Sequence, residues 1–230
     1  MRKNFSRLED KISTNFKNQN LLKQALVHRS YLNENPNFGL DHNERLEFLG
    51  DAVLELVVTE YLYDNYPNPE GELTSWRAAL VNAKMLSQLA RQLGFDDYLY
   101  LSRGEAKDKN NKARDYILAN TFEAVIGAIH LDQGYQAVQE FIKRVVIAEL
   151  PNVLANQLYI DPKSLFQETA QEKLGITPHY EVVDESGPDH NKHFVVAVYV
   201  DKEKVAEGKG SSKQEAQEAA ARNGLKAKGW

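Results

Sequence analysis

The stretch Asn43-Glu44-Arg45-Leu46-Glu47-Phe48-Leu49-Gly50-Asp51-Ala52-Val53-Leu54 decides the fold class of the first part of this chain. Its apolar residues recur at helical spacing, which predicts an amphipathic helix. At 100° per residue, four carboxylates fall within about 80° of one another; these are Glu44, Glu47, Asp51 and Glu55. The predicted buried side is made of Leu46, Leu49, Val53, Leu56 and Val57. Acids opposite an apolar stripe are usually a solvated surface, so the spacing alone does not establish a site.

The same helical spacing extends through most of the first 155 residues. Apolar positions recur every three or four residues in five segments, namely 20–27, 43–63, 76–94, 115–131 and 135–150. We therefore expect an all-α domain over residues 1–155, followed by a short linker at 156–160 where the periodicity stops.

A second, smaller domain is predicted over residues 161–230. Asp161 and Pro162 are typical of a helix start, and Gly175 of its end. The period then changes to two, with strands expected at 180–183, 193–200 and 205–209, and Ser211 or Ser212 caps a last helix through about Leu225. The predicted order is α-β-β-β-α, an α+β domain.

Composition limits the classes of function. The chain contains no cysteine, which excludes disulfides and thiolate metal sites. It has neither an apolar run near 18 residues nor the apolar core of a signal peptide, so we expect a soluble, cytoplasmic protein without a membrane partner. A net charge of -5 does not favour nucleic-acid binding, unless the acids are concentrated in a site that binds cations.

A second polar pair supports such a site. Asn120 and Glu123 are three residues apart and share one side of a predicted helix, with the small residues Ala124 and Gly127 beside them. Another helix can approach closely there, so the oxygen ligands of two helices can face each other. Carboxylate and amide oxygens are the ligands that Mg²⁺ prefers.

The stretch from Asn43 to Leu54 resembles, nearly letter for letter, the signature of the ribonuclease III family of Mg²⁺-dependent nucleases. The resemblance implies that Glu47, Asp51, Asn120 and Glu123 hold the metal and that Glu44, Asp51 and Glu123 are catalytic, with Mn²⁺ as a possible substitute. It also implies a homodimer, in which Phe48 fills a socket of the partner and Glu70 approaches the partner's site. Where this chain has Asn120 the family usually has aspartate, which lowers the charge available to the metal.

Residues 161–230 resemble the double-stranded RNA-binding domain in three segments, at Ser164 to Glu168, at Gly187 to His190 and at Gly210 to Lys213. The resemblance implies that Gln167, Glu168 and His190 contact minor grooves and that Lys209 and Lys213 contact phosphates. These residues include 10 Lys+Arg and 12 Asp+Glu, so we expect modest binding that depends strongly on salt. A basic stretch in the first domain is a solvated loop or a further RNA contact; it contains Lys107, Lys109, Lys112 and Arg114.

Together the two resemblances imply a homodimeric endoribonuclease that hydrolyses both strands of double-stranded RNA and leaves 5′-phosphate and 3′-hydroxyl ends. No nucleotide cofactor is expected, because no phosphate-binding loop motif is present. The alternatives are a double-stranded RNA-binding regulator with weak or no cleavage because of Asn120, and a metal phosphohydrolase for small substrates.

Overall fold

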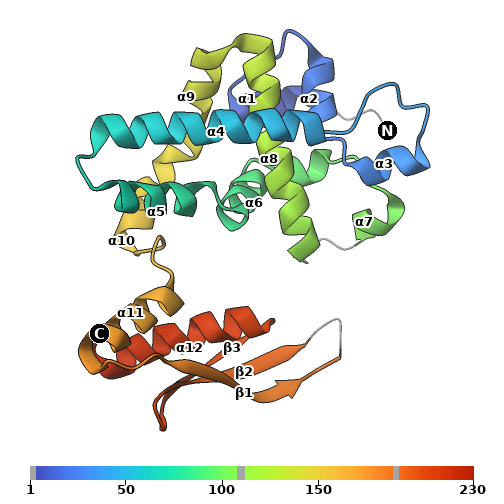
Figure 1. Cartoon of the computed structure of the whole chain (residues 1–230). Helices are drawn as coiled ribbons and strands as arrows, with labels where there is room; N and C mark the ends of the chain where they lie inside the picture. The colour runs from blue at the N-terminus through green and yellow to red at the C-terminus, as the bar shows by residue number, and fades with distance from the viewer. Residues whose placement is uncertain (1–3, 108–111, 189–191) are drawn as a thin grey trace. The chain divides into compact units, whose positions relative to one another are not determined.

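The structure, a computed structural model, describes residues 4–107, 112–188 and 192–230. The chain forms two compact units, Met1–Tyr159 and Ile160–Trp230. Figure 1 shows that helices build the first unit, whereas the second combines helices with strands. The division falls inside the predicted linker.

The first unit is helical, as predicted. Its α-helices are α1 (Ser6–Ile12), α2 (Gln19–Ala25), α3 (Arg29–Glu34), α4 (Glu44–Asn65), α5 (Glu70–Val81), α6 (Ala83–Gln92), α7 (Arg103–Lys107), α8 (Lys112–Gln133), α9 (Tyr135–Val145) and α10 (Leu150–Ala155). Two short 3₁₀ helices, η1 (Phe95–Tyr98) and η2 (Ile147–Glu149), connect some of them.

The segment 76–94, where helical spacing is expected, is helical but divided, because the chain turns at Asn82 between the end of α5 and the start of α6. Asn82 has an extended backbone, and its side-chain oxygen accepts a hydrogen bond of 2.9 Å from the backbone N–H of Met85. Its side-chain nitrogen donates to the carbonyl of Ala79, also at 2.9 Å. One residue thus caps the end of one helix and the start of the next. Hydrophobic periodicity does not detect this, because both helices bury apolar residues in the same core.

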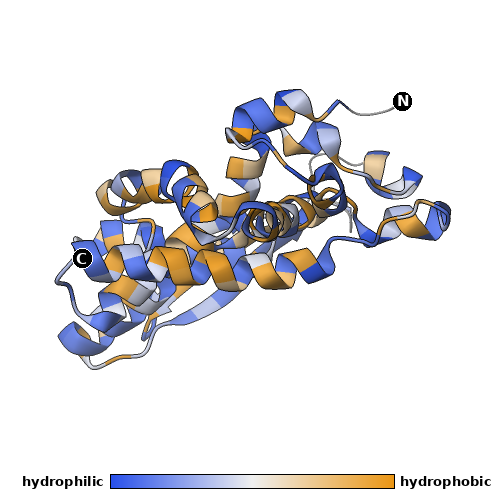
Figure 2. Ribbon diagram, turned by 90° about the horizontal axis from the view of Figure 1, so that it is seen from above, coloured by the Kyte–Doolittle hydropathy of each residue, from blue (hydrophilic) through white to orange (hydrophobic). Residues whose placement is uncertain are grey.

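The core of the first unit surrounds α4 and α8, which cross at its centre (Figure 1). The ribbon coloured by hydropathy shows hydrophobic and hydrophilic residues mixed along α4, as expected of a helix with one buried side (Figure 2). Val53 and Val57 are buried as predicted, but Leu56 is 51% exposed, so its assignment to the buried side is wrong. The buried side is instead continued by Leu54, Val58 and Leu62.

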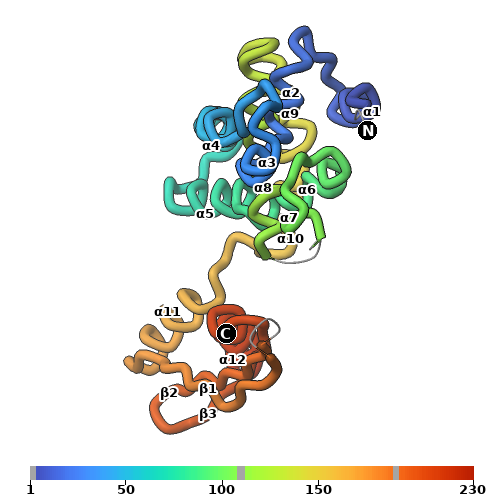
Figure 3. Tube along the Cα trace, turned by 90° about the vertical axis from the view of Figure 1, so that its right-hand side faces the viewer, coloured from blue at the N-terminus to red at the C-terminus, as the bar shows by residue number. Residues whose placement is uncertain are grey.

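The second unit has the predicted α-β-β-β-α order. It consists of α11 (Pro162–Leu174), β1 (His179–Ser186), β2 (His193–Val200), β3 (Glu203–Gly210) and α12 (Lys213–Lys228). The strands form an antiparallel sheet in the order β1-β2-β3, with an irregularity in β1 between Val182 and Asp184. Figure 3 traces the chain through α11 and the strands to α12.

Caps and small residues fix the helices of this unit. The Asp161 carboxylate accepts hydrogen bonds from the backbone N–H groups of Lys163 and Ser164, and Ser212 caps α12 by accepting from the N–H of Glu215. A Cβ atom added at Gly208 of β3 would lie 2.0 Å from the backbone nitrogen of Ala220. The alanine side of α12 therefore packs directly on the sheet, as its composition predicts.

Candidate active site

The candidate site lies where α4 crosses α8, and two glycines allow the crossing. A Cβ atom added at Gly50 of α4 would lie 1.8 Å from the backbone oxygen of Glu123 in α8. At Gly127 of α8, an added Cβ would lie 2.2 Å from the backbone oxygen of Leu46. Real Cβ atoms are essentially never this close to backbone, so only glycine permits this helix separation. Gly127 was noted from the sequence, but the equal importance of Gly50 was not.

This close approach brings the polar residues of the two helices together. The carboxyl pKa of Glu123 is raised to about 8, chiefly by burial and then by the charges of Asp51 and Glu47. Burial and the charges of Glu44 and Asp51 likewise raise the pKa of Glu47, while a hydrogen bond with the Asn120 side chain opposes that shift. The predicted residues Glu47, Asp51, Asn120 and Glu123 therefore form one cluster.

Two basic side chains lie beside Glu44 at the start of α4. Arg29 Nη1 is 3.6 Å from one Glu44 carboxylate oxygen, and His42 Nδ1 is 3.8 Å from the other. Further along α4, Arg77 Nε lies 2.8 Å from Glu55. Neither ion pair is predicted from the sequence, because the pairing of Arg29 with Glu44 and of Arg77 with Glu55 does not follow from helical spacing.

The cluster has the chemistry of a site for a hard divalent cation. Glu47, Asp51 and Glu123 offer carboxylate oxygens and Asn120 offers an amide oxygen, whereas no thiolate exists in the chain. The pKa values of Glu47 and Glu123 are raised first by burial and then by the negative charges of neighbouring carboxylates, so a bound cation would relieve both effects. Within the described residues, no group of three or more His, Asp or Glu side chains is already gathered closely enough to hold an ion. The donor set fits a divalent ion, and binding one requires side-chain adjustment.

The second unit presents most of the predicted RNA-contacting residues to solvent. Gln167 and Glu168 are exposed on α11, Lys209 is exposed in β3, and Lys213 is exposed as the first residue of α12. His190 lies outside the described residues. The positions of α11 and of the start of α12 leave these side chains available to a duplex, while their roles in binding stay a prediction.

The chain was compared with known families and proteins. The family model "Ribonuclease-III-like" matches residues 18–150, more than half of the chain, and the model "Double-stranded RNA binding motif" matches residues 162–227. The chain belongs to the ribonuclease III family. It is accordingly a double-stranded-RNA-specific endoribonuclease.

Relatives match over nearly the whole chain. The chain is 42% identical to "Ribonuclease 3" of Roseiflexus sp. (strain RS-1), over 99% of this chain and 97% of that protein. It is 43% identical to "Ribonuclease 3" of Dehalococcoides mccartyi (strain ATCC BAA-2266 / KCTC 15142 / 195), over 95% of this chain and 92% of that one. Among solved structures, a nuclease domain of ribonuclease III from Campylobacter jejuni is 40% identical with a TM-score of 0.56, over 64% of this chain and 99% of that one. The study of that structure concerns a flexible region involved in its dimer formation.

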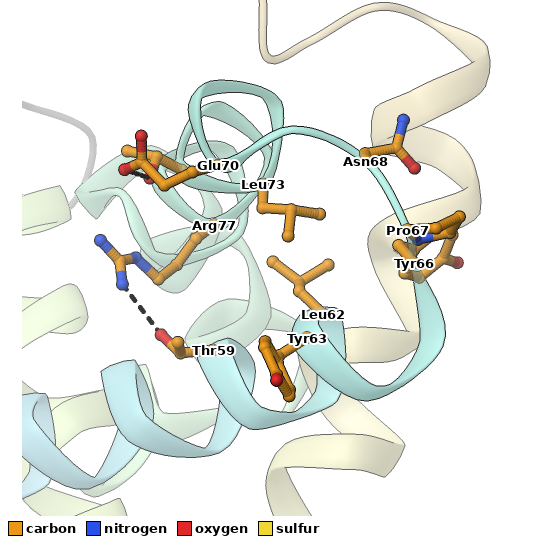
Figure 4. A pocket seen from close by; sticks show the side chains of 10 residues that line it. Thr59, Leu62, Tyr63, Tyr66, Pro67, Asn68, Glu70, Leu73 and Arg77 are labelled. Atoms are coloured by element: carbon orange, nitrogen blue, oxygen red, sulfur yellow. Dashed lines mark hydrogen bonds between the residues drawn. The ribbon is translucent and has the colours of Figure 1, made fainter.

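A pocket of about 570 Å³ opens between the end of α4 and the start of α5 in this ribonuclease III chain (Figure 4). Its wall combines apolar side chains such as Leu62 and Leu73 with Tyr63, Glu70 and Arg77. On α4, Phe48 is 82% exposed and Tyr63 is 80% exposed, and Tyr63 lines this pocket. Large exposed aromatic residues on one helix are typical of a surface that another protein covers.

The basic stretch is divided by the structure. Arg114 is buried, and its Nε donates a hydrogen bond of 2.7 Å to Asp96. Arg114 therefore forms a structural ion pair with Asp96 and is not available to contact RNA. Lys107 and Lys112 are exposed, and Lys109 lies outside the described residues.

Within the described residues, no helix is long and apolar enough to span a membrane.

Proposed function

We propose that this protein is a Mg²⁺-dependent homodimer that hydrolyses both strands of double-stranded RNA and leaves 5′-phosphate and 3′-hydroxyl ends. The observation that supports the proposal is the close crossing of α4 and α8, across which the carboxylates of Glu47, Asp51 and Glu123 interact electrostatically. Mn²⁺ is expected to substitute for Mg²⁺, because it also binds oxygen ligands in octahedral geometry.

Four side chains would hold the metal: Glu47, Asp51, Asn120 and Glu123. When bound, divalent ions neutralise these side chains and supply Lewis-acid chemistry at the phosphate. Glu47 and Asp51 approach from α4, and Glu123 approaches from α8. The crossing fixes the two helices close together, and side-chain adjustment would be needed for these ligands to hold one ion. Glu44 lies one turn before Glu47, where it extends the anionic row toward Arg29.

Asn120 contributes differently from its neighbours. Its side chain is hydrogen-bonded to the Glu47 carboxylate, which favours the charged form of Glu47. An aspartate at this position would instead add repulsion. In the absence of metal, the amide therefore stabilises the cluster. In its presence, the amide contributes an oxygen without charge, so we expect weaker metal binding than an aspartate would give.

The homodimer would complete the catalytic surface. Phe48 projects from the side of α4 that carries the acids, and its ring is almost wholly exposed, so a partner subunit would bury a large apolar area there. The pocket beside Glu70 offers the apolar surface that such a ring needs. By the two-fold symmetry of most dimers, each subunit would give one ring and receive one, which places Glu70 near the site of the partner.

The C-terminal unit would hold the substrate. Gln167, Glu168 and His190 would contact minor grooves, while Lys209 and Lys213 would contact phosphates. The charge balance of residues 161–230, with 10 Lys+Arg and 12 Asp+Glu, does not favour strong RNA binding by this unit alone. The duplex would therefore be held jointly by both units and released as salt increases.

The test is cleavage of end-labelled duplex RNA of about 30 base pairs, with Mg²⁺, with Mn²⁺ and with EDTA, beside the same strands unpaired. We expect cleavage of both duplex strands only with a divalent ion, and products that a ligase joins without prior phosphorylation. Glu123→Gln should abolish cleavage and retain duplex binding, because it removes a ligand without touching the RNA-binding unit. Duplex binding by the wild-type protein without any cleavage would instead support an RNA-binding regulator.

A further inference from the structure

Two arginines lie at opposite ends of the acidic row of α4, which is formed by Glu44, Glu47, Asp51 and Glu55. They differ in their hydrogen bonds and in their exposure to solvent. Arg77 is fixed: its Nε lies 2.8 Å from Glu55, its Nη1 donates a hydrogen bond of 2.9 Å to Thr59, and its side chain is only 34% exposed. Arg29 lies 3.6 Å from Glu44 with a side chain that is 71% exposed. A separation of 3.6 Å is too long for a hydrogen bond, so the contact with Glu44 is a weak ion pair.

The backbone that carries Arg29 is nevertheless held firmly against the start of α4. The backbone N–H of Asn43, the residue before Glu44, donates a hydrogen bond of 2.9 Å to the carbonyl of Val27. The Asn43 side chain is buried and donates to the carbonyl of Ala25 at 3.2 Å. His28 caps α3 by accepting from the N–H of Ser30. Arg29 thus has a backbone that is held next to Glu44 and a guanidinium that is exposed to solvent.

We propose that Arg29 binds an RNA phosphate next to the phosphate at which the strand is cleaved. In doing so it would exchange its weak contact with Glu44 for a contact with that neighbouring phosphate. This proposal rests on the proposed function. A guanidinium has five N–H donors in a planar fork that matches two phosphate oxygens, and Arg29 spends none of them on a hydrogen bond with Glu44.

The negative charge of the acidic row and of Glu123 explains why a cationic side chain beside Glu44 would favour RNA binding. Glu44, Glu47, Asp51 and Glu123 would repel an approaching phosphate backbone, and divalent ions held by the four predicted ligands would offset only part of that negative charge. Arg29 lies at the rim, where the next phosphate along the strand would pass. Arg77 is less suited to this role, because its Nε contacts Glu55 and its Nη1 donates to Thr59, which hold the guanidinium against α4.

A simpler role would be to neutralise Glu44. However, His42 lies 3.8 Å from the second Glu44 oxygen, and Glu44 itself is half-exposed to water with a side chain that is 47% accessible. An exposed carboxylate with a second basic neighbour gains little from a long ion pair. The two roles make different predictions when Glu44 is removed.

The experiment measures duplex RNA binding by Arg29→Ala over a series of salt concentrations, in a Glu123→Gln background with Mg²⁺ so that the RNA stays intact. Each phosphate contact that is lost lowers the salt slope by about one, so a homodimer that loses one contact per subunit should lose about two. The wild-type advantage in affinity should then shrink about 3.5-fold per contact between 50 and 200 mM salt. Arg29→Lys, which keeps the charge, should retain most of the slope. Arg7→Ala, which removes an exposed arginine from α1, is the control for net charge and should leave the slope unchanged.

The double variant Arg29→Ala, Glu44→Gln separates the two roles. A phosphate contact predicts that Arg29→Ala weakens binding equally with and without Glu44, whereas neutralisation of Glu44 predicts no loss once Glu44 is absent. In the protein with Glu123 intact, Arg29→Ala should raise KM more than it lowers kcat. Equal salt slopes for Arg29→Ala and its parent, or the same loss in Arg7→Ala, would overturn the proposal. Wild-type protein that does not cleave duplex RNA would instead overturn the proposed function.

Discussion

Replacing Gly50 by alanine is the most direct test of the helix crossing that builds the site. The new Cβ would lie 1.8 Å from the Glu123 backbone oxygen and 2.9 Å from the backbone nitrogen of Gly127. Ordinary contact begins near 3.4 Å, so the two helices must separate by about 1.6 Å at this point. No side-chain rotation can relieve the clash, because both neighbouring atoms belong to the backbone.

The magnitude follows from two opposing effects. Alanine is the better helix former by about 1 kcal/mol, which favours the variant. Overpacking a close contact costs about 1–3 kcal/mol and more when the backbone itself must move, which disfavours it. We expect the second effect to win by about 2 kcal/mol, which lowers the melting temperature of a unit of this size by roughly 4–8 °C. Because the displaced oxygen belongs to Glu123, the metal ligands also lose their alignment, and cleavage should fall about 100-fold at a temperature where the variant is folded.

The assay is thermal unfolding in EDTA, followed by circular dichroism, with the cleavage rate measured well below the transition. Gly71→Ala is the matched control: it lies in α5 with nothing within 4 Å of the added Cβ, so only helix propensity acts and the protein should be unchanged or slightly more stable. If Gly50→Ala melts at the same temperature as Gly71→Ala and cleaves at the wild-type rate, then the close approach of α4 and α8 does not position the site.

Three further outcomes are expected. In EDTA, the free energy of unfolding of the wild type should fall as pH rises from about 4.5 to about 8, because Glu123 in the folded state keeps a proton that the unfolded chain has already lost. Glu123→Gln should flatten this part of the pH profile. Parallel profiles for the two proteins would refute the raised pKa of Glu123. Phe48→Ala should shift the dimer toward monomer by a few kcal/mol, and an unaltered sedimentation profile at low micromolar concentration would contradict this. Asn120→Asp should be less stable than the wild type in EDTA yet gain more from added Mg²⁺, whereas superimposable Mg²⁺ titrations of melting temperature and cleavage would place Asn120 outside the coordination sphere.

The two fold classes, and the order of the elements in the second unit, could be predicted from the amino-acid sequence alone. Helical spacing and caps are local properties, which is why the prediction of Asp161 as the first cap of that unit is confirmed at the level of single residues. It also indicated which polar residues share a helix side, since a regular helix fixes the angle between Glu47 and Asp51 or between Asn120 and Glu123. Where two explanations share one pattern, as for the helices on either side of Asn82, spacing could not choose between them.

Which helix sides meet, and which charges are neutralised, depends on the arrangement of the helices in space. Gly50 and Gly127 are far apart in the sequence, and their joint effect exists only where α4 and α8 cross. Arg114 was one member of a basic stretch until the fold paired it with Asp96 and buried it. Arg29 and Glu44 are likewise neighbours only because the segment before α3 is bonded to the start of α4. The physical reason is common to all three: burial and Coulomb interactions depend on distances in space, which hydrophobic periodicity along one helix does not contain.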